Sequence, residues 1–461
     1  MSYKKKNNSS GLIFGLVSAI LIGAAGFLYL SPAFEQNKPT ITVEDNIYWN
    51  LRSKLNINLS DDSGIKYYKV TFQDGKRDIV LNQNSFNNLV DIKKNINLNI
   101  TPPKLDSFSK GIEATLKIEV VDNSKWNLLE GNKASKTINI KIDTKKPIAN
   151  VVANSRYIQR GGSAVVVVQV NDENLKDKYI IFNNKKRFEL MPYKKEGYYV
   201  ALIAWPVDID RFSRINLVAI DKANNKTVTK VPFYIQKKKI KTDDIQLSKD
   251  FIKNVSTLVL QESGEDIPDD LADIFIYSNK ELRAKNIQLI EDTAHKAMEN
   301  ITVDNFNIKR FRRLRGSKTV AGFAERRHYY LDGKKINEAW HLGIDWASVR
   351  QAPIKVSNDG DVVFRGYLGL YGNTIIVDHG MGLLSLYAHT STQKVDVGDH
   401  VNAKQTIGNT GATGAVFGDH LHFGIIIQGV EVNPIEWMDK NWIKVRITNI
   451  LKSANKQIAG N

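Results

Sequence analysis

An uncharged, strongly apolar segment near the N-terminus constrains this chain more than any other feature. Residues 11–30, GLIFGLVSAILIGAAGFLYL, contain no charged side chain, and Lys4, Lys5 and Lys6 precede them. At about 1.5 Å per residue, a helix of this length covers about 30 Å, which is the hydrocarbon thickness of a bilayer. The segment therefore predicts a membrane-spanning helix.

The lysines set the predicted orientation of that helix. Positive charge before a first apolar segment stays in the cytoplasm, so the rest of the chain is expected to be exported. A cleaved signal peptide is the alternative, because Ser31-Pro32-Ala33 places small residues at a cleavage-like spacing. Because the apolar run is long for a signal core, we favour a cytoplasmic stub (1–10) and an uncleaved anchor (11–34) in the inner membrane. The bulk would then lie in the periplasm or cell-wall space, which argues against nucleic acid as a partner.

Length and composition limit what the exported part can be. A chain of 461 residues exceeds one ordinary core and suggests three or four domains. The net charge of +16 favours an anionic partner, such as acidic phospholipid or a cell-envelope polymer. The chain has no cysteine, which excludes disulfides, thiolate metal sites and cysteine nucleophiles. Any metal must be held by histidine and carboxylate.

Residues 40–236 read as β-structure. Segments such as SAVVVVQV (163–170) and GYYVALIAW (197–205) are short and rich in β-branched and aromatic residues, and Asn, Asp and Gly clusters separate them. This is the pattern of β-sandwiches. A weak internal repeat supports two copies, because DDSGIKYYKVTF (61–72) resembles NDENLKDKYIIF (171–182).

The repeat predicts two immunoglobulin-like β-sandwiches. Their expected limits are 40–145 and 146–236, and DTKKP (143–147) is the joint between them. The copies have the size of immunoglobulin-like domains, but the Trp and Cys pattern of antibody domains is absent. The term is therefore architectural and carries no function.

A linker and a helical region are expected over 237–315. KKKIKTDD (237–244) reads as a charged linker. DIPDDLADIF (266–275) combines Pro268 with acidic residues, which favours a helix start, and apolar residues then recur every three or four positions to about residue 300. The pattern predicts a helical connector.

The chain becomes basic and then β-rich after the connector. Residues 309–327 hold eight Lys or Arg against one acid, Glu325. They form either a solvated basic face or a surface that meets an anionic envelope polymer. Asp332-Gly333 lies between strand-like runs and predicts a hairpin turn. Gly-punctuated β-structure follows to about residue 438.

Histidine spacing indicates a metal site in this last part. In GDHLHFGI (418–425), His420 and His422 stand two positions apart, so in a strand both side chains point to one face. In HLGIDWA (341–347), His341 and Asp345 stand four apart, which again predicts one face of a strand. These two residues and one histidine of the pair make three ligands suited to Zn²⁺, and three protein ligands are typical of a catalytic zinc.

A further histidine, His389, ends the apolar run LYAH. The ordered series His341-x-x-x-Asp345, then Tyr387-Ala388-His389, then His420-Leu421-His422-Phe423 resembles the lysostaphin-type (LytM-like) zinc peptidases, which cleave peptide cross-links of bacterial peptidoglycan. The similarity covers about residues 320–438 and leaves the sandwiches and the helical region outside. It implies a β-rich, duplicated-hybrid-motif peptidase domain (316–440), followed by a tail (441–461).

The resemblance also implies a role for each residue. His341, Asp345 and His422 would bind one Zn²⁺, and His389 and His420 would be the catalytic pair. The chain has no H-E-x-x-H, so a glutamate base on a helix is not available and histidine must serve. The substrate would be peptidoglycan peptide cross-links, with the membrane and a regulatory protein as further partners.

One departure from the family lies beside the site. Many relatives have a short Ser/Thr-Gly-Pro-like turn before the paired histidines, whereas this chain has TGATGAVFGDHLHF. The additional residues, Ala415 to Asp419, are expected to alter the groove and so the substrate preference. Of the other histidines, His295, His328 and His400 are expected to be structural or solvated. His379 lies in a stretch shared with the family, and no zinc role is assigned to it.

The overall expectation is a mainly β, multidomain, membrane-anchored zinc endopeptidase. The first alternative is a non-catalytic LytM-like regulator that activates another cell-wall hydrolase, but such proteins usually lack one or more zinc ligands, and all five expected residues are present here. The second is a scaffold in which the sandwiches are the working part.

Overall fold

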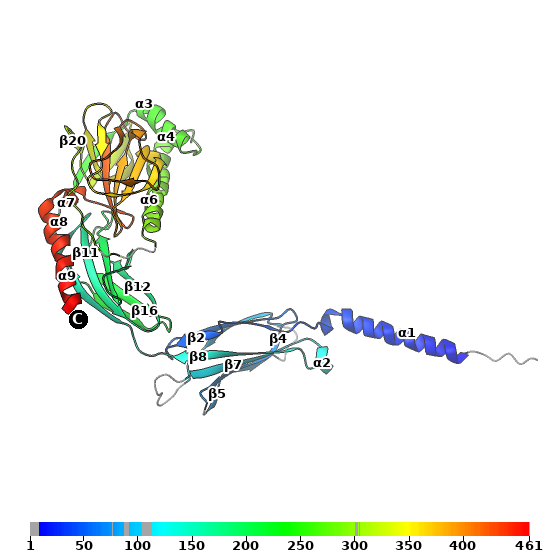
Figure 1. The fold of residues 1–461 in the computed structure, drawn as a ribbon. Coiled ribbons are helices and arrows are strands. Elements are labelled where there is room, and N and C mark those ends of the chain that lie inside the picture. Colours follow the sequence, from blue (N-terminus) through cyan, green and yellow to red (C-terminus); the bar gives the residue numbers. More distant parts are fainter. Residues whose placement is uncertain are drawn as a thin grey trace, which may run out of the picture. The chain divides into compact units, whose positions relative to one another are not determined.

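The computed structural model describes residues 9–75, 77–86, 92–103, 113–299, 303 and 305–460. The chain divides into two compact units, Met1–Lys146 with Asp221–Asn225, and Pro147–Ile220 with Lys226–Asn461. Strands dominate both units (Figure 1), so the mainly β architecture predicted from the sequence is confirmed.

The first unit begins with the apolar helix α1 (Ser9–Leu30), which a short turn, η1 (Pro32–Phe34), follows. Within the described part of the chain, α1 is the one helix long and apolar enough to cross a membrane, with a mean hydropathy of 2.3 over Gly11–Leu30. The predicted helix is confirmed as a helix. An anchor and a signal sequence both satisfy its length and composition.

Two sheets enclose the core of the first unit. Alternation along β3 places Ile57 and Leu59 inside and Asn56 and Asn58 toward the outside, as a strand with one buried face requires. The five-stranded sheet runs β2 (Asn46–Trp49), β8 (Lys133–Ile142), β7 (Glu113–Asp122), β4 (Ile65–Gln73), β5 (Asp78–Ser85), and the three-stranded sheet runs β1 (Thr40–Thr42), β3 (Leu55–Ser60), β6 (Asn95–Ile100). The short helix α2 (Trp126–Leu129) connects β7 to β8.

A second sandwich opens the second unit. One sheet runs β14 (Met191–Pro192), β15 (Tyr198–Ala204), β11 (Ser163–Asn171), β9 (Ile148–Asn154), and the other runs β13 (Lys186–Glu189), β12 (Leu175–Phe182), β16 (Ile215–Asp221), β17 (Lys226–Lys230). A parallel pair, β10 (Tyr157–Gln159) and β18 (Tyr234–Gln236), lies beside them. An immunoglobulin-like relationship for the two sandwiches stays a prediction.

An eight-stranded sheet carries the region in which the histidines cluster. Its path is β20 (Lys318–Ala321), β23 (Ile344–Ala347), β31 (Leu421–Ile427), β27 (Leu383–Ala388), β26 (Asn373–Asp378), β25 (Gly360–Tyr367), β29 (His400–Val401), and β32 (Val430–Val432) pairs with β31. A small sheet runs β24 (Pro353–Lys355), β30 (Thr406–Thr410), β28 (Thr390–Gln393). The turn η4 (Gly369–Tyr371) precedes β26.

A third sheet runs β19 (Lys241–Gln246), β21 (Glu325–Leu331), β22 (Lys334–His341). The predicted hairpin is confirmed, because β21 and β22 are joined at Asp332 (φ +49°) and Gly333 (φ +77°). The expected linker at 237–244 is partly wrong. Its second half belongs to β19, whose backbone pairs in parallel with β21.

The helical segment, defined here as residues 249–297, contains two helical stretches. The first is α3 (Lys249–Phe251), η2 (Ile252–Ser256) and α4 (Thr257–Glu262), and the second is α5 (Leu271–Ile276), η3 (Tyr277–Leu282) and α6 (Arg283–Ala297). The second stretch begins at Leu271, later than the expected start near Pro268. Asp270 caps it, because its carboxylate accepts the N–H groups of Ala272 and Asp273.

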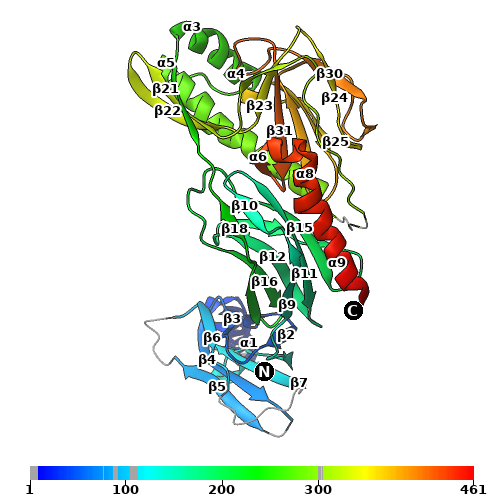
Figure 2. The ribbon, with the colours of Figure 1, turned by 90° about the vertical axis from the view of Figure 1, so that its left-hand side faces the viewer.

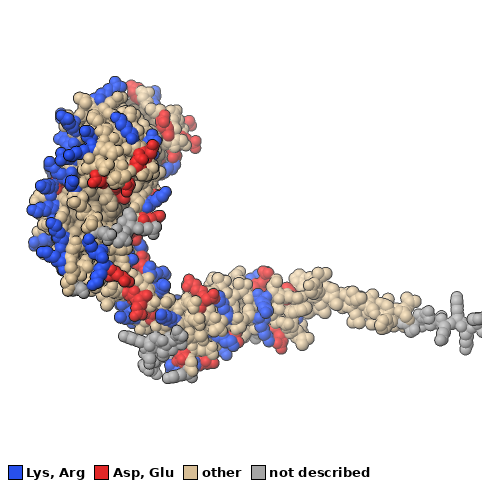
Figure 3. All heavy atoms as spheres, in the orientation of Figure 1, with Lys and Arg blue, Asp and Glu red and all other residues tan. Residues whose placement is uncertain are grey.

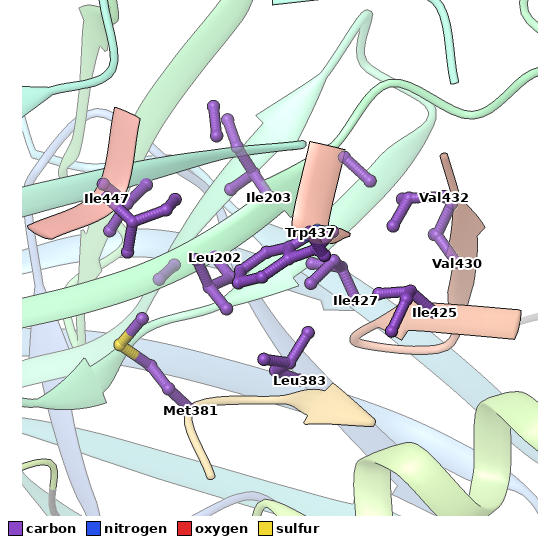
Figure 4. Packing of buried hydrophobic residues seen from close by; sticks show 14 of the residues in the cluster. Leu202, Ile203, Met381, Leu383, Ile425, Ile427, Val430, Val432, Trp437 and Ile447 are labelled. Atoms are coloured by element: carbon purple, nitrogen blue, oxygen red, sulfur yellow. The ribbon is translucent and has the colours of Figure 1, made fainter. Parts of the chain in front are cut away.

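Helix α6 covers one face of the eight-stranded sheet. Ile290 and Ala294 pack with Ile376, Leu386 and Ile426 in one buried cluster. The opposite face joins the second sandwich. In Figure 4, Leu202 and Ile203 of the sandwich lie near Ile427 of β31 and Trp437 of the C-terminal region. The sandwich and the sheet therefore share one core, although the domain limits predicted from sequence placed a boundary and a linker between them.

The predicted tail after residue 440 is largely helical. The C-terminal helices are α7 (Pro434–Met438), α8 (Lys440–Ile443), η5 (Lys444–Thr448) and α9 (Asn449–Gly460). One face of α9 is buried and carries Leu451, Ala454 and Ile458. The Tyr193 hydroxyl donates to Asn455 Oδ1 at 2.7 Å. Helix α9 lies beside β9 and β11 of the sandwich (Figure 2).

Candidate functional site

Three strands bring the predicted metal ligands together. His341 ends β22, Asp345 lies in β23 and His422 lies in β31. Strands β23 and β31 are antiparallel neighbours, and their register places Asp345 directly opposite His422. His422 Nδ1 lies 2.8 Å from Asp345 Oδ1, and His341 Nε2 lies 3.0 Å from Asp345 Oδ2 and 3.2 Å from His422 Nδ1.

The expectation that His341 and Asp345 share one strand is wrong. Leu342 and Gly343 separate β22 from β23, and the two strands belong to different sheets. The chain passes very close to His422 there, because a Cβ on Gly343 would lie 2.4 Å from His422 Nε2. Gly343 therefore lets the chain pass from one sheet to the other close to His422, while the side chains of His341 and Asp345 still converge.

The three converging atoms fit a tetrahedral metal ion. Zinc bonds of about 2.0–2.2 Å at tetrahedral angles place ligand atoms about 3.3–3.6 Å apart, slightly wider than the distances found here. His341 Nδ1 donates to the Gly322 carbonyl at 2.7 Å, which leaves the lone pair of Nε2 free to bind a metal. The donor set of two imidazoles and one carboxylate also matches a divalent transition metal.

Electrostatics favour the ligand-competent protonation states of Asp345 and His422. Burial alone would raise the pKa of Asp345, but the His341 and His422 imidazoles outweigh it and hold that pKa well below its usual range. Burial lowers the pKa of His422 to about 4, so the imidazole is neutral near pH 7. A carboxylate and neutral imidazoles are the forms that bind a metal.

The two remaining predicted residues lie beside the triad. His389 follows β27 and has φ +59°, and His420 immediately precedes β31. Their ring centroids are 4.9 Å apart, and His420 Nε2 lies 3.8 Å from Asp345 Oδ1. The structure therefore brings together all five residues that the sequence singled out.

Backbone carbonyls set the tautomers of this pair. His389 Nδ1 donates to the Thr413 carbonyl at 2.8 Å, and His420 Nδ1 donates to the Gly418 carbonyl at 2.8 Å. Each Nε2 is then free of its proton in the neutral ring. Burial, with smaller contributions from the neighbouring imidazoles, lowers the pKa of His389 to about 3, so the ring is neutral near pH 7.

Sequence reasoning missed Tyr371, which contacts both parts of the site. Its carbonyl accepts the His389 N–H at 2.9 Å, and its ring lies 5.5 Å from the His422 ring, edge to face. Its hydroxyl donates to Glu431 Oε1 at 2.7 Å. No pattern in the sequence separates this tyrosine from the other tyrosines of the chain.

Sequence reasoning also missed Arg327, which it treated as one of the basic residues of 309–327. Arg327 Nη2 lies 3.9 Å from Asp345 Oδ2 and 3.5 Å from Glu325 Oε2. Its Nε is buried and has no hydrogen-bond partner among the described residues. The alternation of β21 was a usable signal, since residues 325, 327 and 329 share one face of the strand.

A cavity of about 380 Å³ surrounds the site, and the helical segment forms part of its wall. Phe251, Phe275 and Arg283 line it together with the five predicted residues. The additional loop that the sequence flagged meets the same segment, because the Phe417 ring stacks on Phe251 with 4.4 Å between centroids.

The other histidines lie apart from this cavity. His379 is held between the Asp359 carbonyl and Ser385 Oγ. The side chains of the remaining three face carboxylates: His295 with Glu291, His328 with Asp244 and Glu338, and His400 with Asp361.

Basic side chains gather elsewhere on the second unit. Figure 3 shows Lys and Arg along the edge that the C-terminal helices form. Within 309–327, seven of the eight basic residues are exposed and Arg327 is the partly buried one. Both interpretations of this basic segment, a solvated face and a surface for an anionic polymer, stay predictions.

Comparison with known proteins identifies this region. Residues 339–434 match Peptidase family M23, and the matched range contains all five converging residues. The resemblance to LytM-like peptidases is confirmed for this part of the chain, which forms an M23 domain.

Three curated relatives illustrate the range of functions in the match. The chain is 40% identical over 95 residues to the DD-carboxypeptidase/endopeptidase Mpg of Neisseria meningitidis, covering 21% of this chain and 22% of that protein. It is 34% identical over 94 residues to the peptidoglycan DD-endopeptidase ShyC of Vibrio cholerae (20% and 22%), and 39% identical over 113 residues to the murein hydrolase activator NlpD of Salmonella typhimurium (23% and 30%). The chain therefore spans less than a third of the length of these relatives.

Proposed function

We propose that this chain is a zinc-dependent endopeptidase that hydrolyses peptide cross-links in bacterial peptidoglycan. The observation that carries the proposal is the convergence of three metal-ligand atoms with two imidazoles whose Nε2 atoms are left free by backbone hydrogen bonds. A site that only binds a metal does not need that pair.

His341 Nε2, Asp345 and His422 Nδ1 would hold the zinc. When bound, the zinc would polarise the scissile carbonyl and lower the pKa of a water toward about 7. Three protein ligands leave a position open for this chemistry.

His389 and His420 would move the protons. His389 is buried and neutral, so its free Nε2 can accept a proton from the attacking water. His389 would then return the same proton to the leaving amine. His420, whose Nε2 lies 3.8 Å from Asp345 Oδ1, would stabilise the oxyanion when that nitrogen is protonated. The choice of His389 and His420 as the catalytic pair follows the LytM-like resemblance.

The proposed substrate lies outside the cytoplasm, which agrees with the apolar helix α1. The helix would anchor the chain in the inner membrane, with the M23 domain in the periplasm or cell-wall space. The partners would be peptidoglycan cross-links, the membrane and a regulatory protein, and not nucleic acid.

A non-catalytic activator is the second candidate. The 39% identity to the activator NlpD supports it. The presence of all five residues at interacting distances supports the enzyme instead.

The test is to incubate the purified full-length chain, in detergent and loaded with zinc, with isolated peptidoglycan. Fragments are identified by mass spectrometry with and without a chelator. Chelator-sensitive loss of cross-linked dimers is expected. Intact cross-links, together with stimulation of a second hydrolase in the same assay, would support the activator and contradict the enzyme.

A further inference from the structure

Arg327 is a cation of the cavity whose hydrogen-bonding capacity is largely unused. A guanidinium has five N–H donors in a planar fork. The Nη2 bond to Glu325 at 3.5 Å is its single side-chain hydrogen bond in the described structure, and it is long. Nε is buried without a partner. A buried donor without a partner costs stability, and such a group in a native structure calls for an explanation.

The neighbouring carboxylates do not satisfy this arginine. Asp345 Oδ2 is 3.9 Å from Nη2, beyond hydrogen-bond distance, and both oxygens of Asp345 face imidazoles. Glu325 Oε1 already accepts from Gly322 N–H and Lys241 Nζ, each at 3.1 Å. The two terminal nitrogens of Arg327, Nη1 and Nη2, therefore remain available to a ligand, because the side chain is 21% exposed, whereas the buried Nε is not accessible.

The second arginine of the cavity differs. Arg283 Nη2 donates to Asn279 Oδ1 at 2.6 Å, and its Nε donates to the Asn279 carbonyl at 3.2 Å. Two donors of the Arg283 guanidinium are therefore already bonded to Asn279, one turn earlier in the same helical stretch. Asp243 and Glu325 also line the cavity and would repel an anion placed near them. Among the described lining residues, Arg327 is the position best suited to bind a negative group.

We propose that Arg327 is a specificity-determining residue that binds a free carboxylate of the substrate next to the scissile bond. A planar guanidinium fork matches a carboxylate with two parallel N–H···O bonds. Because Arg327 Nη2 lies 3.9 Å from Asp345 Oδ2, a bound carboxylate would lie near the reacting bond, within about two residue steps of ~3.8 Å along a peptide.

This inference rests on the proposed function and narrows its substrate class. It selects cross-links to a diamino dicarboxylic acid, whose cross-linked end keeps a free α-carboxylate next to the cleaved bond. Glycine bridges lack such a group inside the bridge. It therefore predicts discrimination between a carboxylate and its amide at one position of the substrate.

The test uses two synthetic cross-linked peptides that differ only there, one with the free carboxylate and one with the primary amide. The zinc-loaded full-length chain in detergent is expected to prefer the carboxylate by roughly 10–100-fold in kcat/KM. Arg327→Gln is expected to remove the preference by lowering cleavage of the carboxylate peptide alone. Arg327→Lys, which keeps the charge but not the fork, is expected to retain part of it.

Arg326→Gln is the matched control. Arg326 is adjacent in β21, points to the opposite face and pairs with Glu338 at 2.6 Å. The substitution removes the same charge and is expected to leave the preference unchanged. An equal loss on both peptides in Arg327→Gln, with loss of bound zinc, would instead make Arg327 a positioning residue for Asp345 and overturn the proposal. Equal cleavage of both peptides by the unaltered chain would also overturn it.

A binding measurement separates this inference from the proposed function. In the His389→Ala background, peptide binding is measured by calorimetry with and without Arg327→Gln. The inference is supported if the carboxylate peptide binds more tightly than the amide peptide and Arg327→Gln abolishes that preference. If the unaltered chain shows this preference in binding but cleaves neither peptide, only the proposed function is contradicted. Equal binding of both peptides, or no binding of either, would overturn the inference.

Discussion

The two halves of the candidate site are built differently. The metal half, His341, Asp345 and His422, lies on or at the end of strands, and its side chains contact one another at 2.8–3.2 Å. The catalytic half, His389 and His420, lies just outside the ends of β27 and β31, where loop carbonyls fix each ring. The register of strands therefore determines one half, and the conformation of loops determines the other.

The difference matters for what each half tolerates. A strand register is fixed by many backbone bonds and buried side chains, so its geometry is hard to shift without unfolding. A loop carbonyl can move by a small displacement of a few residues. We therefore expect changes around the metal half to affect metal affinity, and changes around the catalytic half to affect turnover with the metal in place.

The largest expected effect separates the halves directly. His341→Ala and His389→Ala are each expected to lower peptidoglycan cleavage by about 10²–10⁴-fold or more. Only His341→Ala should lose the metal, because His389 is not one of the proposed ligands. Zinc content after gel filtration and fragment analysis check this. His400→Ala, which removes an exposed imidazole bonded to Asp361, is the control. Full activity in His389→Ala would contradict the assigned role.

A pair of glycines extends the same comparison. Gly343→Ala would place a Cβ 2.4 Å from His422 Nε2 and 2.7 Å from the Phe423 carbonyl, whereas Gly418 has nothing within 4 Å. Gly343→Ala is expected to weaken zinc affinity by about 10–100-fold. Gly418→Ala should leave it unchanged. Competition with a chromogenic chelator measures both, and equal affinities in the two variants would contradict the steric argument.

Asp419 tests the loop half with a smaller effect. Its carboxylate accepts the Gln351 N–H at 2.9 Å and the Thr410 hydroxyl at 2.5 Å, which anchors the loop before His420. Asp419→Ala is expected to lower kcat by about tenfold, equivalent to about 1.4 kcal/mol, with zinc content unchanged. Asp419→Asn keeps an acceptor oxygen and should retain more activity. Loss of zinc in Asp419→Ala would show that the halves are not separable here.

The last comparison concerns stability rather than activity, at a support that both halves share. Burial raises the pKa of Glu431, the acceptor of the Tyr371 hydroxyl, to about 7 from an ordinary 4.5. A carboxyl with a raised folded-state pKa contributes stability that is present below pH 4.5 and is lost as pH rises through about 7. The loss in the free energy of unfolding is on the order of 3 kcal/mol.

Glu431→Gln keeps the acceptor for Tyr371 but cannot ionise. Its Tm is therefore expected to fall less than that of the unaltered chain between pH 5 and pH 8. Some decline should persist, because burial also raises the pKa of Glu436 to about 7. Thermal melts monitored by tryptophan fluorescence measure the difference. Parallel pH profiles for both proteins would contradict a role for Glu431 ionisation.

The same contrast explains how far the sequence alone could go. Patterns carried by a single element were readable, such as the Asp332-Gly333 hairpin and the apolar helix before residue 31. The convergence of the five site residues was predicted, but the reason given for His341 and Asp345 was wrong, since they lie on different strands.

What sequence reasoning missed depends on contacts between distant segments. Gln428 of the M23 domain links it to the second sandwich within their shared core, because its amide donates to the Glu189 and Leu202 carbonyls at 3.0 Å each. No local pattern predicts such a contact. The helix in the predicted tail was readable in principle, because Leu451, Ala454 and Ile458 follow helical spacing.

Three of the histidines, His341, His389 and His420, bond through Nδ1 to the main-chain carbonyls of Gly322, Thr413 and Gly418. These carbonyls determine that Nε2 of each ring faces the site. Every residue type has the same carbonyl group. The surroundings of these histidines can therefore diverge in sequence over evolutionary time while the rings keep their orientation, as long as the path of the backbone is preserved. A comparison of side chains alone would overlook this part of the site, because what is inherited there is the shape of the chain.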